Sequence, residues 1–206
     1  MRGALAFVLP ALVLAPAIAR ADVDWAKGLV TADGVGVADR HAPNPAVARG
    51  TSRRGAEDAA RKKLAVAVSA LTLASGAKVG HPKDAAVAAR LAAAVDHALE
   101  LTAEPETDGA WRVTMAVPIE AVRQALAGPR VLSAAGDQPA AVVIVDGVTG
   151  KPAVGALSAA TIWVTPDSLP AWAKDAPHVS GKRGKGGAIE GIDVQPQALY
   201  VIVGKP

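Results

Sequence analysis

The residues best suited to bind a ligand form one short basic segment, Gly181-Lys182-Arg183-Gly184-Lys185-Gly186-Gly187. Exposed backbone amides together with cationic side chains can hold a phosphate group or an acidic polymer. The order of glycine, lysine and hydroxyl residues is not that of a nucleotide-binding phosphate loop. Lys182, Arg183 and Lys185 are therefore the candidate anion-binding residues. The same composition is also typical of a solvated, mobile loop that contributes little to folding.

Side chains that support catalysis or metal binding are present, but they form no recognisable motif. No two of the four histidines have the i,i+4 spacing of helical metal ligands: His41, His81, His97 and His178. No Gly-x-Ser-x-Gly element marks a nucleophilic serine. Four acidic residues gather around one predicted turn, where such residues are usually solvated: Glu100, Glu104, Glu106 and Asp108. We therefore expect no catalytic residue, no metal and no cofactor, and an uncharacterised hydrolase is the least favoured function.

Two further features have a structural interpretation. Residues 146–151 follow a short apolar stretch and contain two glycines, as a phosphate loop would. Because Pro152 comes next and no helical pattern begins, we interpret this segment as a turn. Trp163 lies within an apolar stretch and is expected in a core, whereas Trp172 lies in a predicted loop and is expected to pack against the body of the protein.

The first residues have the pattern of an export signal. Arg2 supplies a positive charge, residues 5–18 are apolar, and small residues fit a peptidase site near Ala19 or Ala21. The apolar stretch is shorter than the roughly 20 residues that span a bilayer, and prolines interrupt it. We therefore predict a cleaved signal peptide over 1–21, no permanent membrane anchor, and a periplasmic or extracellular protein.

Charge and cysteine content narrow the classes further. The chain has 22 Lys and Arg against 19 Asp and Glu, and removal of Arg2 and Arg20 with the signal leaves 20 against 19. A nearly neutral protein has no general reason to bind nucleic acid, so no nucleic-acid partner is expected. The chain contains no cysteine, which excludes disulfide bonds and a lipid attached through cysteine. The remaining chain, about 185 residues long, can form a hydrophobic core of its own.

Hydrophobic periodicity predicts an α+β protein. Residues 22–128 are expected to pack two main helices on an antiparallel sheet, 129–139 to form a connector, and 140–206 to form a β-rich C-terminal part. The predicted helices cover about 45–73, 82–98 and 119–127, and the predicted strands cover about 28–37, 99–106, 111–117, 141–145, 160–164 and 199–203.

Local signals support these elements. Gly34 and Gly36 indicate a bulge or a close backbone approach in the first strand. Asn44 followed by Pro45 is typical of a helix start, and Asp108-Gly109 is typical of a hairpin turn.

The first two predicted helices each have an apolar stripe. In the first helix it comprises Ala56, Ala60, Leu64, Ala67 and Leu71, and in the second it comprises Val87, Leu91, Val95 and Leu99. The charged side of the first helix contains acid-before-base pairs at i,i+4, which stabilise an exposed helix: Glu57 with Arg61, and Asp58 with Lys62.

Three stretches carry a resemblance to one group of envelope proteins. Residues 24–36 begin with Asp-Trp and continue into a glycine-punctuated strand, residues 42–64 contain Ala-Arg and Asp-Ala-Ala-Arg, and residues 108–118 run from Asp-Gly to a proline. In this order they resemble the LPP-twenty lipoprotein family and the N-terminal module of the flagellar assembly protein FlgT. The resemblance implies an α+β module of the cell envelope, without catalytic residues that can be mapped here. The lipid-attachment cysteine of the family is absent, so membrane anchoring does not follow.

These observations favour a secreted or periplasmic, non-enzymatic module that binds or assembles with another cell-envelope macromolecule, either a protein or a polymer. The alternative is a periplasmic protein that binds an anionic ligand or polymer through the basic segment 181–187.

Overall fold

The computed structural model describes residues 21–128 and 141–205, and its fold class is α+β as predicted. The predicted signal peptide, apart from Ala21, and the predicted connector lie outside these residues.

The N-terminal part contains a four-stranded antiparallel sheet in the order β1-β2-β4-β3. Its strands are β1 (Asp22–Asp24), β2 (Leu29–Gly36), β3 (Leu99–Pro105) and β4 (Trp111–Pro118). The predicted Asp108-Gly109 turn joins β3 to β4, and Gly109 has a φ of +83°, which favours glycine. Alternation along β4 buries Val113, Met115 and Val117 on one face of the sheet.

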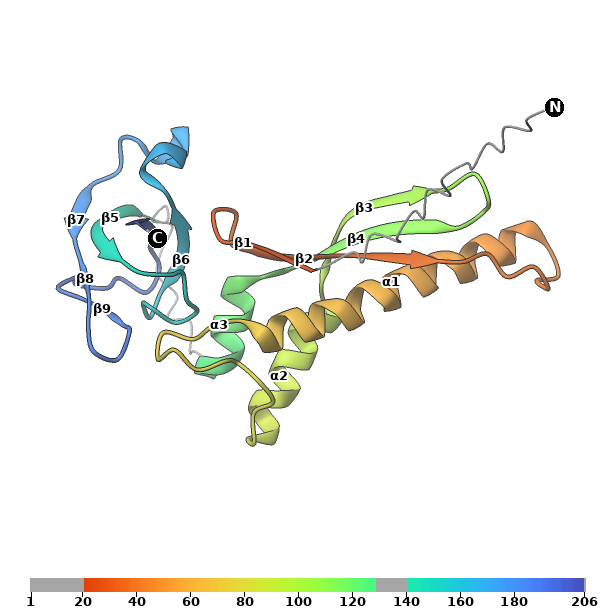
Figure 1. Ribbon diagram of the computed structural model, residues 1–206, viewed down its shortest axis with the longest axis horizontal. Helices are drawn as coiled ribbons and strands as arrows, with labels where there is room; N and C mark the ends of the chain where they lie inside the picture. The colour runs from red at the N-terminus through yellow and green to blue at the C-terminus, as the bar shows by residue number, and fades with distance from the viewer. Residues whose placement is uncertain (1–20, 129–140, 206) are drawn as a thin grey trace, which may run out of the picture.

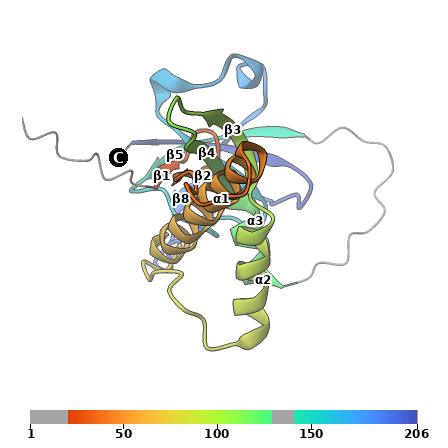
Figure 2. The same ribbon diagram turned by 90° about the vertical axis from the view of Figure 1, so that its right-hand side faces the viewer.

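Three α-helices belong to the described residues of this part, and they are α1 (Pro45–Ala70), α2 (Ala85–Asp96) and α3 (Ile119–Ala127). The predicted start of α1 is confirmed, because the Asn44 side chain accepts a hydrogen bond from a first-turn amide and Pro45 is the first helical residue. Helix α1 packs on β2 and β4. Helix α2 packs against α3 and α1, and it points away from the sheet (Figure 2).

The predicted helix boundaries differ from the observed ones at two places. Helix α1 ends at Ala70 rather than Leu73, because the next residue has extended backbone angles. Helix α2 begins after Asp84, whose carboxylate accepts from two helix amides, rather than at Pro82. The helix also ends before Leu99, which begins β3 and is exposed instead of extending the apolar stripe.

Gly34 and Gly36 bring the backbone of β2 directly against the backbone of α1. A Cβ atom added at Gly34 would overlap the carbonyl oxygen of Ala56 and lie 2.6 Å from the amide nitrogen of Ala60. A Cβ atom added at Gly36 would overlap the carbonyl oxygen of Ser52. The Ser52 hydroxyl donates a hydrogen bond to the Gly36 carbonyl at 2.6 Å. The predicted close backbone approach is therefore confirmed.

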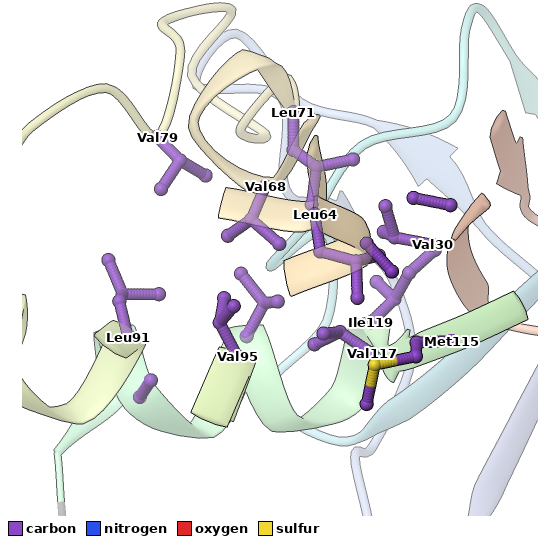
Figure 3. Close-up of a cluster of buried hydrophobic side chains, with 14 of the residues drawn as sticks. Val30, Leu64, Val68, Leu71, Val79, Leu91, Val95, Met115, Val117 and Ile119 are labelled. Atoms are coloured by element: carbon purple, nitrogen blue, oxygen red, sulfur yellow. The ribbon is translucent and has the colours of Figure 1, made fainter. Parts of the chain in front are cut away.

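The main hydrophobic core lies where α1 meets the sheet and the other two helices (Figure 3). The predicted apolar face of α1 is confirmed at Ala56, Ala60 and Leu64, which are fully buried. Leu91 and Val95 of α2 close the core on the side away from the sheet. Burial of one such leucine contributes about 1.5–3 kcal/mol relative to leaving it exposed.

The C-terminal part is β-rich, as predicted, and its main sheet is parallel. The strands β5 (Val142–Thr149), β6 (Ala160–Val164), β7 (His178–Ser180) and β10 (Leu199–Lys205) lie in the order β6-β10-β5-β7. A separate hairpin pairs β8 (Lys182–Arg183) with β9 (Ile189–Glu190). Parallel strands are usually joined by helical crossovers. Here the β6–β7 connection contains only two short 3-10 helices, η1 (Pro166–Ser168) and η2 (Ala171–Ala173).

Strand β5 is longer than expected and includes most of the segment interpreted as a turn. Asp146 pairs with Ser180 of β7, and Val148 is buried and pairs with Gly204 of β10. The interpretation of residues 146–149 as a turn is therefore wrong. A parallel sheet with β10 on one side and β7 on the other continues the strand past Gly147, although that glycine has a φ of +80°.

Backbone hydrogen bonds join the two parts of the molecule. The Trp163 amide donates to the Trp25 carbonyl at 3.0 Å. Val154 donates to the Thr72 carbonyl and accepts from the Ala74 amide, both at 2.9 Å. Trp25 packs against the cores of both parts. The C-terminal part is therefore fixed at one end of the long axis, and the β3–β4 turn and the start of α1 lie at the other (Figure 1).

We predict that Gly34→Ala lowers the free energy of unfolding by about 1–3 kcal/mol or more, because its Cβ has no space between β2 and α1. Gly50→Ala is the matched control, since an added Cβ there meets no atom within 4 Å. That change, within α1, should stabilise the protein by about 0.5–1 kcal/mol. Urea unfolding of both variants measures the difference, and equal stability of Gly34→Ala and wild type would contradict the packing described here.

Candidate functional site

The basic segment forms an ordered hairpin rather than the mobile loop that its composition suggested. Lys182 pairs with Glu190 and Arg183 pairs with Ile189 across β8 and β9. The Gly184 amide donates to the Ala188 carbonyl at 2.8 Å, which closes the turn. The prediction of a loop is therefore wrong at Lys182 and Arg183, which form a strand paired with β9, because backbone pairing does not depend on the small side chains that suggested a loop.

Arg183 is the structural centre of this hairpin. Its Nε donates to the Gly187 carbonyl at 3.1 Å, and its Nη1 donates to the Lys151 carbonyl at 2.6 Å. Its guanidinium carbon lies 5.7 Å from the centroid of the Trp163 ring, within the range of a cation–π interaction. Arg183 therefore connects the hairpin to the end of β5 and to the buried Trp163 of β6.

The three candidate anion-binding residues are consequently not equivalent. Arg183 is committed to two carbonyl groups and an indole ring, whereas Lys182 and Lys185 are exposed. Within the described part of the chain, no carboxylate forms an ion pair with any of the three. The Glu190 side chain nevertheless lies against Gly184, and its negative charge lowers the positive potential of the hairpin.

We predict that Arg183→Ser destabilises the protein, while Lys182→Ser with Lys185→Ser does not. Each hydrogen bond from a charged donor contributes about 1.5–3 kcal/mol, so loss of both should lower the melting temperature measurably. The double lysine variant should stay within about 0.5 kcal/mol of wild type, as exposed changes usually do. Thermal unfolding followed by circular dichroism compares them, and a stable Arg183→Ser protein would show that the arginine contacts are dispensable.

A carboxylate–histidine pair that sequence reasoning missed lies nearby, on β5 and β7. His178 Nδ1 is 2.6 Å from Asp146 Oδ2, and both side chains are about half exposed. Because an ionised carboxylate only accepts, Nδ1 is the donor in this pair and Nε2 takes no part in it. The two residues are 32 positions apart, and only the parallel pairing of β5 with β7 brings them together.

This pair alone is an incomplete catalytic group. A nucleophilic mechanism needs a hydroxyl or thiol within hydrogen-bond reach of the histidine. In residues 21–128 and 141–205, no hydroxyl forms a hydrogen bond with His178, and no group of three potential ligands is placed to hold a metal ion. The geometry therefore provides an imidazole oriented by a carboxylate, with no hydroxyl nucleophile hydrogen-bonded to it among the described residues.

Strand β3 is one of the two edge strands of the N-terminal sheet, because β4 is its one neighbour among the described strands. Two of its side chains are large, apolar and exposed, and these are Leu99 at 52% and Leu101 at 46%. The pairing with β4 is shifted by one residue between Glu100 and Thr102, which leaves Leu101 as the extra residue of a bulge.

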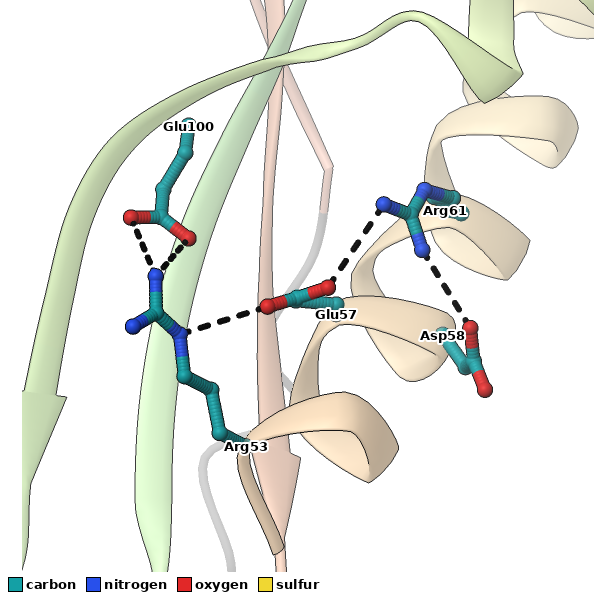
Figure 4. A network of polar contacts seen from close by, with 5 residues as sticks. All are labelled: Arg53, Glu57, Asp58, Arg61 and Glu100. Atoms are coloured by element: carbon teal, nitrogen blue, oxygen red, sulfur yellow. Dashed lines mark hydrogen bonds and ion pairs between the residues drawn. The ribbon is translucent and has the colours of Figure 1, made fainter. Parts of the chain in front are cut away.

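Glu100 attaches this edge strand to α1 through a network of ion pairs (Figure 4). Arg53 Nη2 is 2.9 Å from both carboxylate oxygens of Glu100, and Arg53 Nε is 3.3 Å from Glu57. The hydrogen bond with Glu100 raises the pKa of Arg53. The guanidinium also lies 5.4 Å from the Trp111 ring centroid. These contacts hold β3 against α1, and no other strand of the described residues pairs with its far edge.

The charged side of α1 follows the sequence prediction in part. The Glu57–Arg61 pair is confirmed at 3.6 Å. Asp58 pairs with Arg61 at 3.3 Å rather than with Lys62, so that second prediction is wrong. Arg61 bridges both acids because Nη2 reaches Glu57 and Nη1 reaches Asp58.

The tryptophans occupy different environments. Trp163 is buried in the C-terminal core, as expected. Trp172 is 59% exposed in η2, so the expectation that it packs against the body is wrong. Its neighbour Ala173 is buried in its place, because a 3-10 turn directs adjacent side chains to different sides.

Comparisons with protein-family models, with curated proteins and with solved structures find no significant match to this chain. None of the helices that the structure describes is both long and apolar enough to cross a membrane.

Proposed function

We propose that the chain is an exported, non-enzymatic module of the cell envelope that binds an extended segment of another envelope protein along β3. The observation that carries this proposal is the open edge of β3, with Leu99 and Leu101 exposed on it. The export pattern at the N-terminus and the resemblance to the LPP-twenty family support a periplasmic or extracellular setting. No membrane anchor is needed for this role.

An open edge strand offers two kinds of recognition. Peptide groups on the side away from β4 can pair with an incoming strand, which supplies affinity without regard to sequence. Exposed side chains on the edge then select the partner. Leu99 and Leu101 therefore favour a segment that places apolar side chains opposite them.

The charges of β3 argue against a second copy of the same strand as the partner. Antiparallel self-pairing centred on Thr102 would place Glu100 of one copy opposite Glu104 of the other, and like charges in that position are destabilising. The bulge at Leu101 and the proline at the strand end, Pro105, also restrict indiscriminate pairing. The edge therefore favours a different protein over self-association.

We predict that Leu99→Asp with Leu101→Asp abolishes capture of the partner from envelope extracts and leaves the fold intact. Both side chains are exposed, so the free energy of unfolding should change by less than about 1 kcal/mol. The matched control is Val66→Asp, an equally polar change at an apolar residue of α1 that is 69% exposed. Quantitative affinity capture compares the variants, and equal capture by all of them would refute the role of the β3 edge.

The second candidate function is binding of an anionic polymer through Lys182, Arg183 and Lys185. It is favoured by the absence of acidic ion-pair partners for these three cations among the described residues. Such binding should weaken steeply as salt rises, whereas strand addition along β3 should not. The double lysine variant, with Arg183 retained, separates this electrostatic role from stability. An uncharacterised hydrolase using His178 is the third candidate, and it is tested by turnover of a substrate panel.

A further inference from the structure

A pocket of about 390 Å³ lies where the two parts of the molecule meet. Asp22, Asp24 and Trp25 line it from the N-terminal part, and Trp163 and Thr165 are among the residues that line it from the C-terminal part. Its volume is typical of small-molecule sites, which form preferentially at such junctions. None of its lining residues belongs to β3, so this site is independent of the protein-binding edge.

One wall of the pocket is open because two glycines and a strand irregularity form it. Gly150 has a φ of +105°, and a Cβ atom there would lie 3.0 Å from Nη1 of Arg183. A Cβ atom at Gly204 would lie 3.6 Å from the Trp163 ring. The pairing of β10 with β5 shifts between Ile202 and Gly204, and such bulges are concentrated next to functional sites. Neither glycine contributes a side chain to this wall.

Two carboxylates line the pocket, and two cations contact its lining residues from outside. Asp22 and Asp24 supply two carboxylates on one lip. Lys27 Nζ lies 3.2 Å from Asp24, and Arg183 stacks on the Trp163 ring. Partial burial acts to raise the pKa of Asp24, but hydrogen bonds from Lys27 outweigh that effect and lower it, so the residue stays ionised. Two acids beside two bases favour a ligand without net charge.

The carboxylate oxygens of Asp22 and Asp24 nevertheless remain strong hydrogen-bond acceptors. Among the described residues, the Asp22 side chain accepts a hydrogen bond at Oδ1 from the adjacent Val23 amide, and Oδ2 keeps its acceptor capacity. Hydroxyl groups form short, charge-assisted hydrogen bonds to such oxygens. The indole of Trp25, which is partly buried and lines the pocket, presents an apolar surface beside them.

We propose that this pocket binds an uncharged saccharide segment. A pyranose ring combines an apolar C–H face, which stacks on Trp25, with hydroxyl groups that donate to Asp22 and Asp24. The pocket offers both an aromatic surface and carboxylate acceptors on one lip. It therefore matches the apolar face and the hydroxyl groups of an uncharged sugar. A cationic amine also matches the carboxylates, but the ion pair of Lys27 with Asp24 already offsets one of these charges, and an anion is repelled by the carboxylates.

Isothermal titration calorimetry of the purified protein with two uncharged probes, an N-acetylglucosamine tetrasaccharide and maltotetraose, tests the proposal. At least one probe should bind with a Kd below about 1 mM. Asp22→Ala, at an exposed position, should weaken that binding about tenfold or more through the loss of a charged acceptor. Trp25→Leu should also weaken it, and the matched control Trp172→Leu should bind as wild type does.

The proposal is overturned if neither tetrasaccharide binds, or if binding is unchanged in Asp22→Ala. Because Trp25 also packs against both cores, the Asp22 variant decides the matter if Trp25→Leu does not fold. Saturable binding of tetramethylammonium in place of the saccharides would assign the pocket to a cation and would equally overturn it. Partner capture through β3 is measured in a separate experiment. A negative result for the pocket therefore does not affect the test of β3, and a negative result for β3 does not affect the test of the pocket.

Discussion

The contact of backbone with backbone between β2 and α1 is the constraint on which the rest of the N-terminal part depends. Gly34 and Gly36 allow the helix to lie so close that any side chain at either position would overlap its carbonyl groups. This distance sets how deeply Leu64 reaches into the core and how near α1 comes to β4. Small residues along the helix, Ala56 and Ala60, complete the fit, as close packing of protein interiors requires.

The same close packing explains why β3 is left open. Helix α1 follows β2 and β4, and it reaches β3 through the long side chain of Arg53 rather than through its backbone. The edge strand is therefore held by ion pairs on its inner side while its outer peptide groups remain available. An exposed edge with two leucines is a liability for a soluble protein unless a partner covers it. This liability is the reason why we propose that β3 binds a partner.

The fold of the C-terminal part depends on contacts between residues that are distant in the sequence. Arg183, Trp163 and the carbonyl of Lys151 come from three separate segments and meet at the hairpin. The Trp25 contact then fixes this part to the first, and the pocket between them exists only because both are in place. The basic segment, which composition assigns to a loop, thus helps to hold the C-terminal part together. Residues near the ends of strands line the pocket.

By itself, the sequence determined the local elements: the hairpin at Asp108-Gly109, the start of α1 at Asn44, the buried face that contains Leu64, and the α+β class. These follow from periodicity, capping and turn chemistry, which act over a few residues. Only the tertiary structure decided the parallel C-terminal sheet, the structural role of Arg183 and the Asp146–His178 pair. Each of these depends on contacts between segments that are distant in the chain, and such contacts leave no periodic trace in the sequence.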